Sequence, residues 1–431
     1  MTNGYRSRVL LGFALAAAAA IGAPAQSDPA ATEPEAGASP TYYRGSLQSP
    51  GGELPFLVRE QNERLGLVHG LEDRSFEGAI GGDSDWRFPP YDARITTPFL
   101  PPGGESWQGA WRKVRGNGED TLPFRMRGVE GEVAPMFPLA GKPLAVAGRW
   151  RVRFASDPEH DAVAIFGKNP SPLFDAAGEV AGTFLTVTGD YRYLVGTARG
   201  DQLRLAVFDG AHAFLFHATM LDDGTLRGEF WSGSTWHDTW TARRDDAVAL
   251  PDAFTLTRAE PAVDIGALRY PDVATGEPRQ LRDLFGRATL VVLFGTWCPN
   301  CGDSGAYLRE LRTKYEDRGL RVIGLAFEHG DDRKRHARVV QAYRERYDVP
   351  WPILLAGPSS KRAASAAFPA VDAVRSYPTT LFLDDSGTVR AVHQGFAGPA
   401  TGAAYAAQKA AFEAIVRRLL GVERGEPQRR K

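Results

Sequence analysis

The chain has 431 residues, a length that allows two or three domains. Apolar residues make up 43% and charged residues 24%, which is typical of a globular protein and excludes a wholly disordered or collagen-like chain. The net charge of −1 gives no reason to expect nucleic acid or an anionic membrane as partner, and two cysteines exclude a multi-disulfide scaffold and a four-cysteine zinc site.

The first 25 residues have the organisation of an export signal. A short positive region precedes the apolar, alanine-rich segment from Val9 to Ile21, and small residues around Pro24 suit cleavage after Ala25. An uncleaved anchor is the alternative, but this segment is shorter than the roughly 20 residues that span a bilayer. We therefore expect a signal peptide over 1–25 and an exported protein, periplasmic or secreted, with no stable membrane insertion.

A disordered linker is expected over 26–40, which is rich in Ala, Pro and Glu, and an all-β domain over 41–250. In the segment Arg149–Phe154, three apolar side chains alternate with three arginines, as in a half-buried strand. Short runs of this kind, separated by Gly and Asp turns, predict an antiparallel barrel or sandwich. Trp107–Trp111 resembles Leu226–Phe230, which raises the hypothesis of two tandem meanders; chance similarity is the alternative.

Two histidines and three tryptophans of this domain are candidate binding residues. His212 and His217 are five residues apart, which places them on opposite faces of a strand, so a shared metal is disfavoured. Trp231, Trp236 and Trp240 suit a ligand cavity or the core, and core packing is the more frequent role of such residues. The β-domain therefore offers no defensible chemistry by itself.

The pattern changes to alternating strands and helices over 258–421. A continuous apolar run, Thr289–Phe294, predicts a strand buried on both faces, and the segments that follow alternate between helical and strand periodicity. This order predicts an α/β domain with a mixed sheet flanked by helices. The last residues, 422–431, are expected to form a disordered tail.

Both cysteines lie directly after that buried strand, at the start of a predicted helix. Cys298 and Cys301 are separated by Pro299 and Asn300, so one helical turn brings the two thiols together. The helix N-terminus favours a thiolate at Cys298 and predicts a lowered pKa. We expect Cys298 to attack a disulfide and Cys301 to resolve the mixed disulfide.

Three other roles for the cysteine pair were considered. Two cysteines cannot complete a tetrahedral zinc site without other ligands. Attachment of a c-type haem requires His at position 302, which is Gly. A structural disulfide would close so small a loop that it would restrict the unfolded chain little. The redox role is therefore favoured, without a metal or cofactor.

The segment from Gly295 to Cys301, together with Tyr377-Pro378-Thr379-Thr380, resembles the thioredoxin superfamily and most closely its TlpA-like exported thiol–disulfide oxidoreductases. The resemblance implies that Pro378 is cis and faces a redox-active Cys298–Cys301 disulfide. It further implies that Trp297, Tyr377 and Pro378 bind substrate, with an extended substrate segment pairing beside Pro378.

Further segments resemble a TlpA-like subgroup with an extra N-terminal β-domain. Two of them, Gly189–Leu194 and Phe208–His212, lie in the β-segment; Gly324–His329 and Gly395–Gly402 lie in the C-terminal one. The resemblance therefore implies that the two domains belong together.

The sequence departs from the family at the proton acceptor of the resolving thiol. The position of the buried aspartate of thioredoxin is Val292, and the glutamate of many TlpA-like proteins is replaced by Ser304, beside Asp303. Glu328 ends the next parallel strand at the same sheet edge as Cys298, so we hypothesise that it assists deprotonation of Cys301. A solvated loop glutamate is the equally weighted alternative.

The sequence thus predicts an exported protein-disulfide reductase that acts on protein or small thiol and disulfide substrates and receives electrons from a membrane thiol–disulfide reductase. A ligand- or metal-binding protein that uses the thioredoxin-like domain for docking is the alternative. Peroxidase activity is less favoured, because the threonine of peroxiredoxins falls at Gly295 here and Thr296 is out of register.

Overall fold

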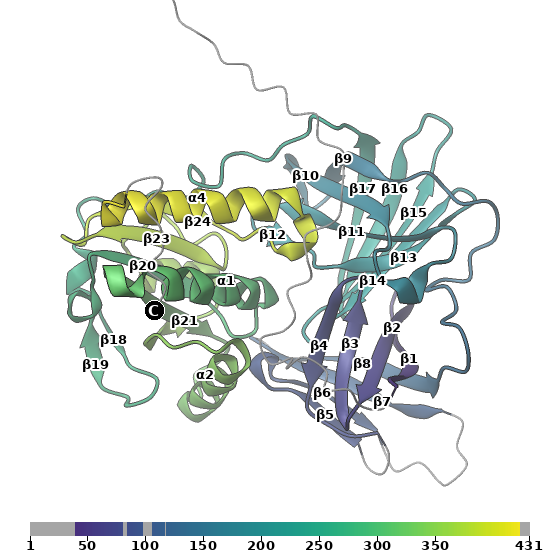
Figure 1. Cartoon of the computed structure of the whole chain (residues 1–431), viewed down its shortest axis with the longest axis horizontal. Helices are drawn as coiled ribbons and strands as arrows, with labels where there is room; N and C mark the ends of the chain where they lie inside the picture. The colour runs from purple at the N-terminus through teal and green to yellow at the C-terminus, as the bar shows by residue number, and fades with distance from the viewer. Residues whose placement is uncertain (1–38, 81–83, 98–105, 117, 423–431) are drawn as a thin grey trace, which may run out of the picture.

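The computed structural model describes residues 39–80, 84–97, 106–116 and 118–422. They form an N-terminal β-region and a C-terminal α/β domain that lie side by side (Figure 1). The predicted signal peptide, nearly all of the predicted linker and nearly all of the predicted tail lie outside the described residues. Among the helices that are described, none has the length and apolar character of a membrane span.

The first β-sheet has eight antiparallel strands in the order β4-β3-β2-β1-β8-β7-β6-β5. Their bounds are Thr41–Ser49 (β1), Gly52–Gln61 (β2), Arg64–His69 (β3), Glu72–Phe76 (β4), Ser84–Phe88 (β5), Ala93–Thr97 (β6), Trp107–Arg115 (β7) and Gly118–Gly128 (β8). Strand β8 shows why this sheet forms, because its buried Leu122, Phe124 and Met126 alternate with exposed residues. One face of the sheet therefore packs on a core.

The second sheet closes into a barrel. Its order is β10-β9-β17-β16-β15-β14-β13-β11-β12, and β10 also pairs with β11, so eight strands form a ring to which β12 is attached. The bounds are Gly148–Phe154 (β9), Asp157–Lys168 (β10), Glu179–Thr186 (β11), Gly189–Asp190 (β12), Leu194–Arg199 (β13), Gln202–Phe208 (β14), Ala213–Met220 (β15), Leu226–Ser232 (β16) and Trp236–Arg244 (β17). The predicted antiparallel all-β architecture is confirmed.

The first sheet covers one outer face of the barrel. In β14, Leu205 and Val207 belong to the barrel core, whereas Ala206 and Phe208 pack into the core of the first sheet. Strand β14 is therefore buried on both sides over this stretch. The similar segments Trp107–Trp111 and Leu226–Phe230 fall in β7 and β16, one in each sheet.

The tryptophans and histidines of the β-region have separate environments. Trp240 is 2% exposed in the barrel core and Trp231 is partly buried against the first-sheet core, but Trp236 is 51% exposed. The core prediction is wrong for Trp236, because this residue opens β17 beside the turn from β16. His212 and His217 line different cavities.

The C-terminal domain has a mixed five-stranded sheet in the order β22-β21-β20-β23-β24. Strands β20, β21 and β22 are parallel, and β23 and β24 run antiparallel to their neighbours, as predicted. The bounds are Ala288–Phe294 (β20), Leu320–Glu328 (β21), Ile353–Pro358 (β22), Thr379–Asp384 (β23) and Val389–Gln394 (β24), with a small pair Arg269–Pro271 (β18) and Pro278–Gln280 (β19).

Four helices accompany this sheet. They are Pro299–Tyr315 (α1), Arg333–Tyr347 (α2), Lys361–Ala367 (α3) and Ala403–Leu420 (α4). Helices α1 and α4 lie alongside one another (Figure 1), and the rings of Tyr307 and Phe412 join them at 6.0 Å between centroids. Every residue of β20 is buried, so the strand that leads to the cysteines is fixed from both faces.

Candidate active site

The two cysteines form a close pair at the N-terminus of α1. Cys298 is the N-cap residue of the helix and Cys301 lies in its first turn. Both are free thiols, and the backbone N–H of Cys301 donates to Sγ of Cys298 at 3.3 Å. Cys298 is 9% exposed and Cys301 is 1% exposed, so Cys298 is the more accessible of the two sulfurs.

Cys301 is held as a thiol by its surroundings. Burial raises the pKa of Cys301, and hydrogen bonding to Cys298 raises it further. The hydroxyl group of Tyr343 on α2 donates to the backbone oxygen of Cys301 at 2.8 Å and fixes the first turn of the helix. Cys301 therefore requires a proton acceptor before it can act as a nucleophile.

Glu328 is buried at the end of β21, with 1% of its surface exposed. Its two carboxylate oxygens accept hydrogen bonds from the backbone N–H and the hydroxyl group of Thr296, each at 2.9 Å. Burial raises the pKa of Glu328 to about 7, whereas the hydrogen bonds from Thr296 lower it. The environment is not that of a solvated loop residue, and a carboxyl group with this pKa exchanges protons readily near neutral pH.

The other predicted site residues surround Cys298. The Tyr377–Pro378 bond is cis, as the resemblance implies, and Sγ of Cys298 lies 3.6 Å from the backbone oxygen of Tyr377. The indole N–H of Trp297 donates to the backbone oxygen of Phe327 at 2.9 Å, and its ring packs edge-on against Tyr377. Trp297, Tyr377 and Pro378 thus lie beside the reactive sulfur.

The β-region also reaches this site, through the turn between β11 and β12. The backbone oxygen of Thr188 accepts from the hydroxyl group of Ser376 at 2.9 Å, next to the cis peptide. The side chain of Asn300 donates to the backbone oxygen of Asp190 at 3.0 Å. The turn 187–190 therefore lies against the side chains of Ser376 and Asn300, next to the segment where the resemblance implies that an extended substrate pairs.

A buried charge cluster joins the domains behind the cysteines. We call Glu72, Arg74, Arg192, Asp209 and Asp303 the interdomain charge cluster. Arg192 contacts Glu72 at 2.8 Å and also Asp303, and Arg74 contacts Asp303 at 3.0 Å. Because Asp303 lies in α1, two residues after Cys301, β4 and the barrel are tied directly to the active-site helix.

A cavity of about 570 Å³ opens beside Cys298 between the two domains. We call it the interdomain cavity. Its C-terminal wall includes Trp297 and Cys298, and its β-region wall includes Lys113, Arg115 and His212. The volume is in the range of small-molecule sites. The β-region thus supplies one wall of the space in front of Cys298.

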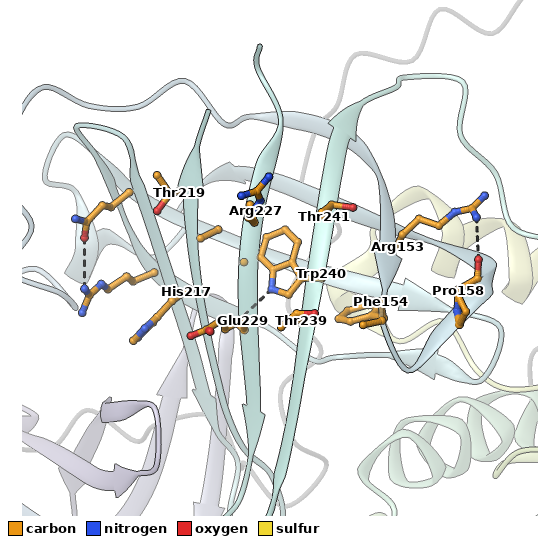
Figure 2. Close-up of a pocket in the computed structure, with 15 residues that line it drawn as sticks. Arg153, Phe154, Pro158, His217, Thr219, Arg227, Glu229, Thr239, Trp240 and Thr241 are labelled. Atoms are coloured by element: carbon orange, nitrogen blue, oxygen red, sulfur yellow. Dashed lines mark hydrogen bonds between the residues drawn. The ribbon is translucent and has the colours of Figure 1, made fainter. Parts of the chain in front are cut away.

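A second cavity, of about 760 Å³, lies on the outer face of barrel strands β9 and β14 to β17 (Figure 2). Exposed polar side chains line it, including Arg153, Arg227 and Glu229, and the indole N–H of Trp240 donates to the backbone oxygen of Glu229 at 3.2 Å. None of its described lining residues belongs to the C-terminal domain. The described residues also contain no group of three His, Cys, Asp or Glu side chains arranged for a metal ion.

Comparison with known proteins relates the C-terminal domain to a protein family. Residues 259–392 match the family model described as AhpC/TSA family. The C-terminal domain is a thioredoxin-like domain of that family. The thioredoxin-like protein YneN of Bacillus subtilis (strain 168) is 30% identical over 121 residues, which are 28% of this chain and 64% of YneN.

Other relatives of the thioredoxin-like domain have related names. The thiol-disulfide oxidoreductase ResA of Halalkalibacterium halodurans is 25% identical over 122 residues, which are 28% of this chain and 61% of ResA. A solved thiol:disulfide interchange protein of the thioredoxin family, from Chlorobium tepidum TLS, is 25% identical with a TM-score of 0.28, covering 38% of this chain and 98% of that chain. The chain thus spans less than two thirds of YneN and of ResA.

The residues of the thioredoxin-like domain around Cys298 were predictable from the sequence, whereas of the β-region residues in the cavity wall only His212 was a candidate, and for a metal that it does not share with His217. Lys113, Arg115 and the interdomain charge cluster were not singled out. The segments Gly189–Leu194 and Phe208–His212 contained the signal, since Arg192 and Asp209 belong to the charge cluster. Nothing in the sequence alone pairs these residues with Asp303.

Proposed function

We propose that this protein is an exported thiol–disulfide oxidoreductase that reduces disulfide bonds through Cys298 and Cys301. The observation that carries the proposal is the position of the dithiol, at a helix N-terminus and directly beside the cis Pro378. At the helix N-terminus the backbone N–H of Cys301 donates to Sγ of Cys298, and a thiolate is the species that attacks a disulfide.

The reaction proceeds in two exchanges. The thiolate of Cys298 attacks one sulfur of the substrate disulfide, forms a mixed disulfide and releases the other sulfur as a thiolate, which takes up a proton. Cys301 then loses its proton and attacks Sγ of Cys298. This step releases the second substrate thiol and leaves a Cys298–Cys301 disulfide, so two electrons have passed to the substrate.

Glu328 is the proposed proton acceptor for Cys301. Its buried carboxyl group ends β21, next to the strand that leads to the cysteines, and its charge acts on Cys301 to raise the pKa of that thiol. The hydroxyl group of Thr296 donates to Glu328, and position 295, where a peroxiredoxin would have its threonine, is Gly. This arrangement favours disulfide exchange over peroxidase chemistry.

Repeated turnover requires a source of electrons. An exported dithiol works in an oxidising compartment, so we propose that a membrane thiol–disulfide reductase reduces the Cys298–Cys301 disulfide. Export rests on the predicted signal peptide over 1–25. A reduction potential near or below roughly −250 mV, measured by equilibration with dithiols, is expected; a value above roughly −180 mV would instead indicate an oxidant or isomerase.

The proposal is tested by dithiothreitol-driven reduction of 2-hydroxyethyl disulfide, a small neutral substrate. Cys298→Ser should reduce the rate to that of dithiothreitol alone. Cys301→Ser should accumulate a mixed disulfide at Cys298, visible by intact mass, with loss of turnover. If Cys298→Ser keeps the parent rate, the dithiol is not the reactive centre and the binding-protein alternative gains support.

A further inference from the structure

We infer that the interdomain cavity selects small anionic disulfides, whose sulfur meets Cys298 while their carboxylates meet Lys113 and Lys361. The inference rests on the proposed function and narrows its substrate class. It is carried by the charges that line the cavity, by its volume and by the turn 187–190, which contacts Ser376 and Asn300 at its edge.

Lys113 is a buried cation that lacks a carboxylate partner among the described residues. It lies on β7, lines the cavity and is 7% exposed. Its one described hydrogen bond runs from Nζ to the backbone oxygen of Ala211, at 2.9 Å. A buried ammonium group is costly unless it is paired, and one hydrogen bond leaves it donors for an anion. Arg115, on the same strand, differs because it is paired with Asp120.

Lys361 supplies a second cation from the thioredoxin-like domain. It begins α3, is exposed and lines the same cavity as Cys298. Its side chain has no ion pair or hydrogen bond with the rest of the described chain. Lys113 and Lys361 therefore present positive charge from the two domains that form the cavity.

The cavity contains little negative charge to oppose these lysines. Asp190 is the only carboxylic side chain that lines it within the described ranges. Its oxygens accept from the backbone N–H of Gly398 at 2.7 Å and from that of Arg192 at 3.1 Å, so they are directed at the protein backbone. Burial raises the pKa of Asp190 to about 8, which keeps much of this group neutral near pH 7. The lining thus favours anions.

Size and access favour a small molecule over a protein segment. Cys298 is mostly covered, and the cavity of about 570 Å³ suits a compact ligand. An extended peptide would have to pair beside Pro378, but Thr188 and Asp190 contact Ser376 and Asn300 there. The turn 187–190 therefore occupies space next to the segment that would receive such a peptide.

In the step that follows, the Cys298 thiolate attacks one sulfur of the anionic disulfide. The S–S bond of the substrate breaks, one anionic thiol leaves and takes up a proton, and the other stays bound to Cys298 in the mixed disulfide. Attack by Cys301 releases it and forms the Cys298–Cys301 disulfide. An external dithiol, here dithiothreitol, returns the two electrons.

The experiment compares three small-molecule disulfides that differ in charge, of which glutathione disulfide is also several times larger than the other two, so the lysine variant isolates the effect of charge. Glutathione disulfide is anionic, 2-hydroxyethyl disulfide is neutral and cystamine is cationic. Insulin, whose chains are joined by disulfides, is the protein substrate, and its reduction is measured in parallel. We expect kcat/KM to be highest for glutathione disulfide. Lys361→Gln should raise KM for glutathione disulfide about fivefold and leave the neutral disulfide unchanged, as expected for the loss of one partly exposed charge contact. Lys334→Gln, an exposed lysine outside the cavity, is the matched control.

The outcomes separate this inference from the proposed function. Equal kcat/KM for the three small disulfides, a preference for cystamine or for insulin, or no effect of Lys361→Gln would overturn the inference while the oxidoreductase function stands. Failure to reduce any of the four disulfides would overturn the proposed function itself. A charge preference that disappears in Lys361→Gln and persists in Lys334→Gln supports the inference.

Discussion

The thioredoxin-like domain and the β-region contribute residues to the candidate site from different distributions along the sequence. In the thioredoxin-like domain, the groups proposed to react lie at the ends of neighbouring strands and at the start of α1, within a continuous stretch from β20 to β21. In the β-region, the residues that reach the same place come from β4, β7 and the turns after β11 and β14. The first arrangement is local in sequence, whereas the second exists only after two sheets have formed.

This difference corresponds to two proposed functions, the reaction at the dithiol and the control of access to it. The local arrangement holds the dithiol that we propose as the nucleophile, with a helix N-terminus and the carboxyl group that we propose as its proton acceptor close in sequence. The dispersed arrangement determines what reaches the nucleophile, because it forms a wall and a cover. The β-region thus needs no reactive group of its own to affect the reaction.

The largest expected effect is a loss of stability when the charge cluster between the two regions is disrupted. Arg192 is 1% exposed and contacts Glu72 and Asp303, so Arg192→Met would remove one of the two cations that pair with these buried carboxylates and leave only Arg74. We expect the free energy of unfolding in urea to fall by about 3–5 kcal/mol. Arg243→Met, which removes an exposed ion pair to Asp223, is the control and should cost less than about 1 kcal/mol. Equal losses in the two variants would show that the cluster does not join the domains.

The next effect concerns the local arrangement. Glu328 accepts a proton only as a carboxylate, and its pKa is raised to about 7 mainly by burial, so the rate of disulfide reduction should rise as the pH increases through about 7. Glu328→Gln should remove this rise and lower the rate at pH 8 by about tenfold to a hundredfold. Glu277→Gln, at an exposed position, should retain the parent profile. An unchanged profile in Glu328→Gln would leave Cys301 without this proton acceptor.

A smaller effect is expected where the β-region covers Pro378. A Cβ atom at Gly189, whose φ is +140°, would lie 2.3 Å from Nδ2 of Asn300. Gly189→Ala should therefore displace the turn 187–190 and increase insulin reduction severalfold. Gly118→Ala is closely matched, since its φ is +146° and nothing lies within 4 Å of the added Cβ. If both variants reduce insulin at the parent rate, the turn does not restrict access.

The smallest effect is a pH dependence of substrate affinity. Burial and the nearby Arg115 lower the pKa of Lys113 to about 8, against the opposing influence of Asp209, Asp120 and Cys298. The ammonium charge is present below that pH and is lost above it, so KM for glutathione disulfide should rise about fivefold between pH 7 and pH 9. The neutral 2-hydroxyethyl disulfide should show no such rise, and Lys113→Met should abolish it. A parallel rise for both disulfides would argue against an anion site at Lys113.

Much of the thioredoxin-like domain was predictable because its signals are local. The buried run before Cys298 and the Cys-Pro-Asn-Cys spacing determine a strand, a helix start and a dithiol within about one dozen residues. The position of Glu328 followed from the rule that parallel strands end at one sheet edge. Its burial did not follow, because that depends on Thr296 and on the packing around it.

The β-region was predictable only as a class. Alternation in the segment Arg149–Phe154 predicted its inward and outward faces, and these are observed. The closure of β10 on β11 and the burial of Ala206 depend on pairings between distant strands, which periodicity does not encode. The same holds for Lys113 and Arg192, whose partners lie about 100 or more residues away.

The most direct test of the account is a competition for Cys298 in the Cys301→Ser variant, which cannot resolve a mixed disulfide. The reduced variant is mixed with equimolar glutathione disulfide and insulin, and intact mass identifies the adduct that forms first. The account predicts a glutathione adduct at Cys298, formed faster than any insulin adduct. An insulin adduct that forms first would contradict a thiol enclosed by the β-region, and no adduct with either compound would contradict the proposed chemistry of the dithiol.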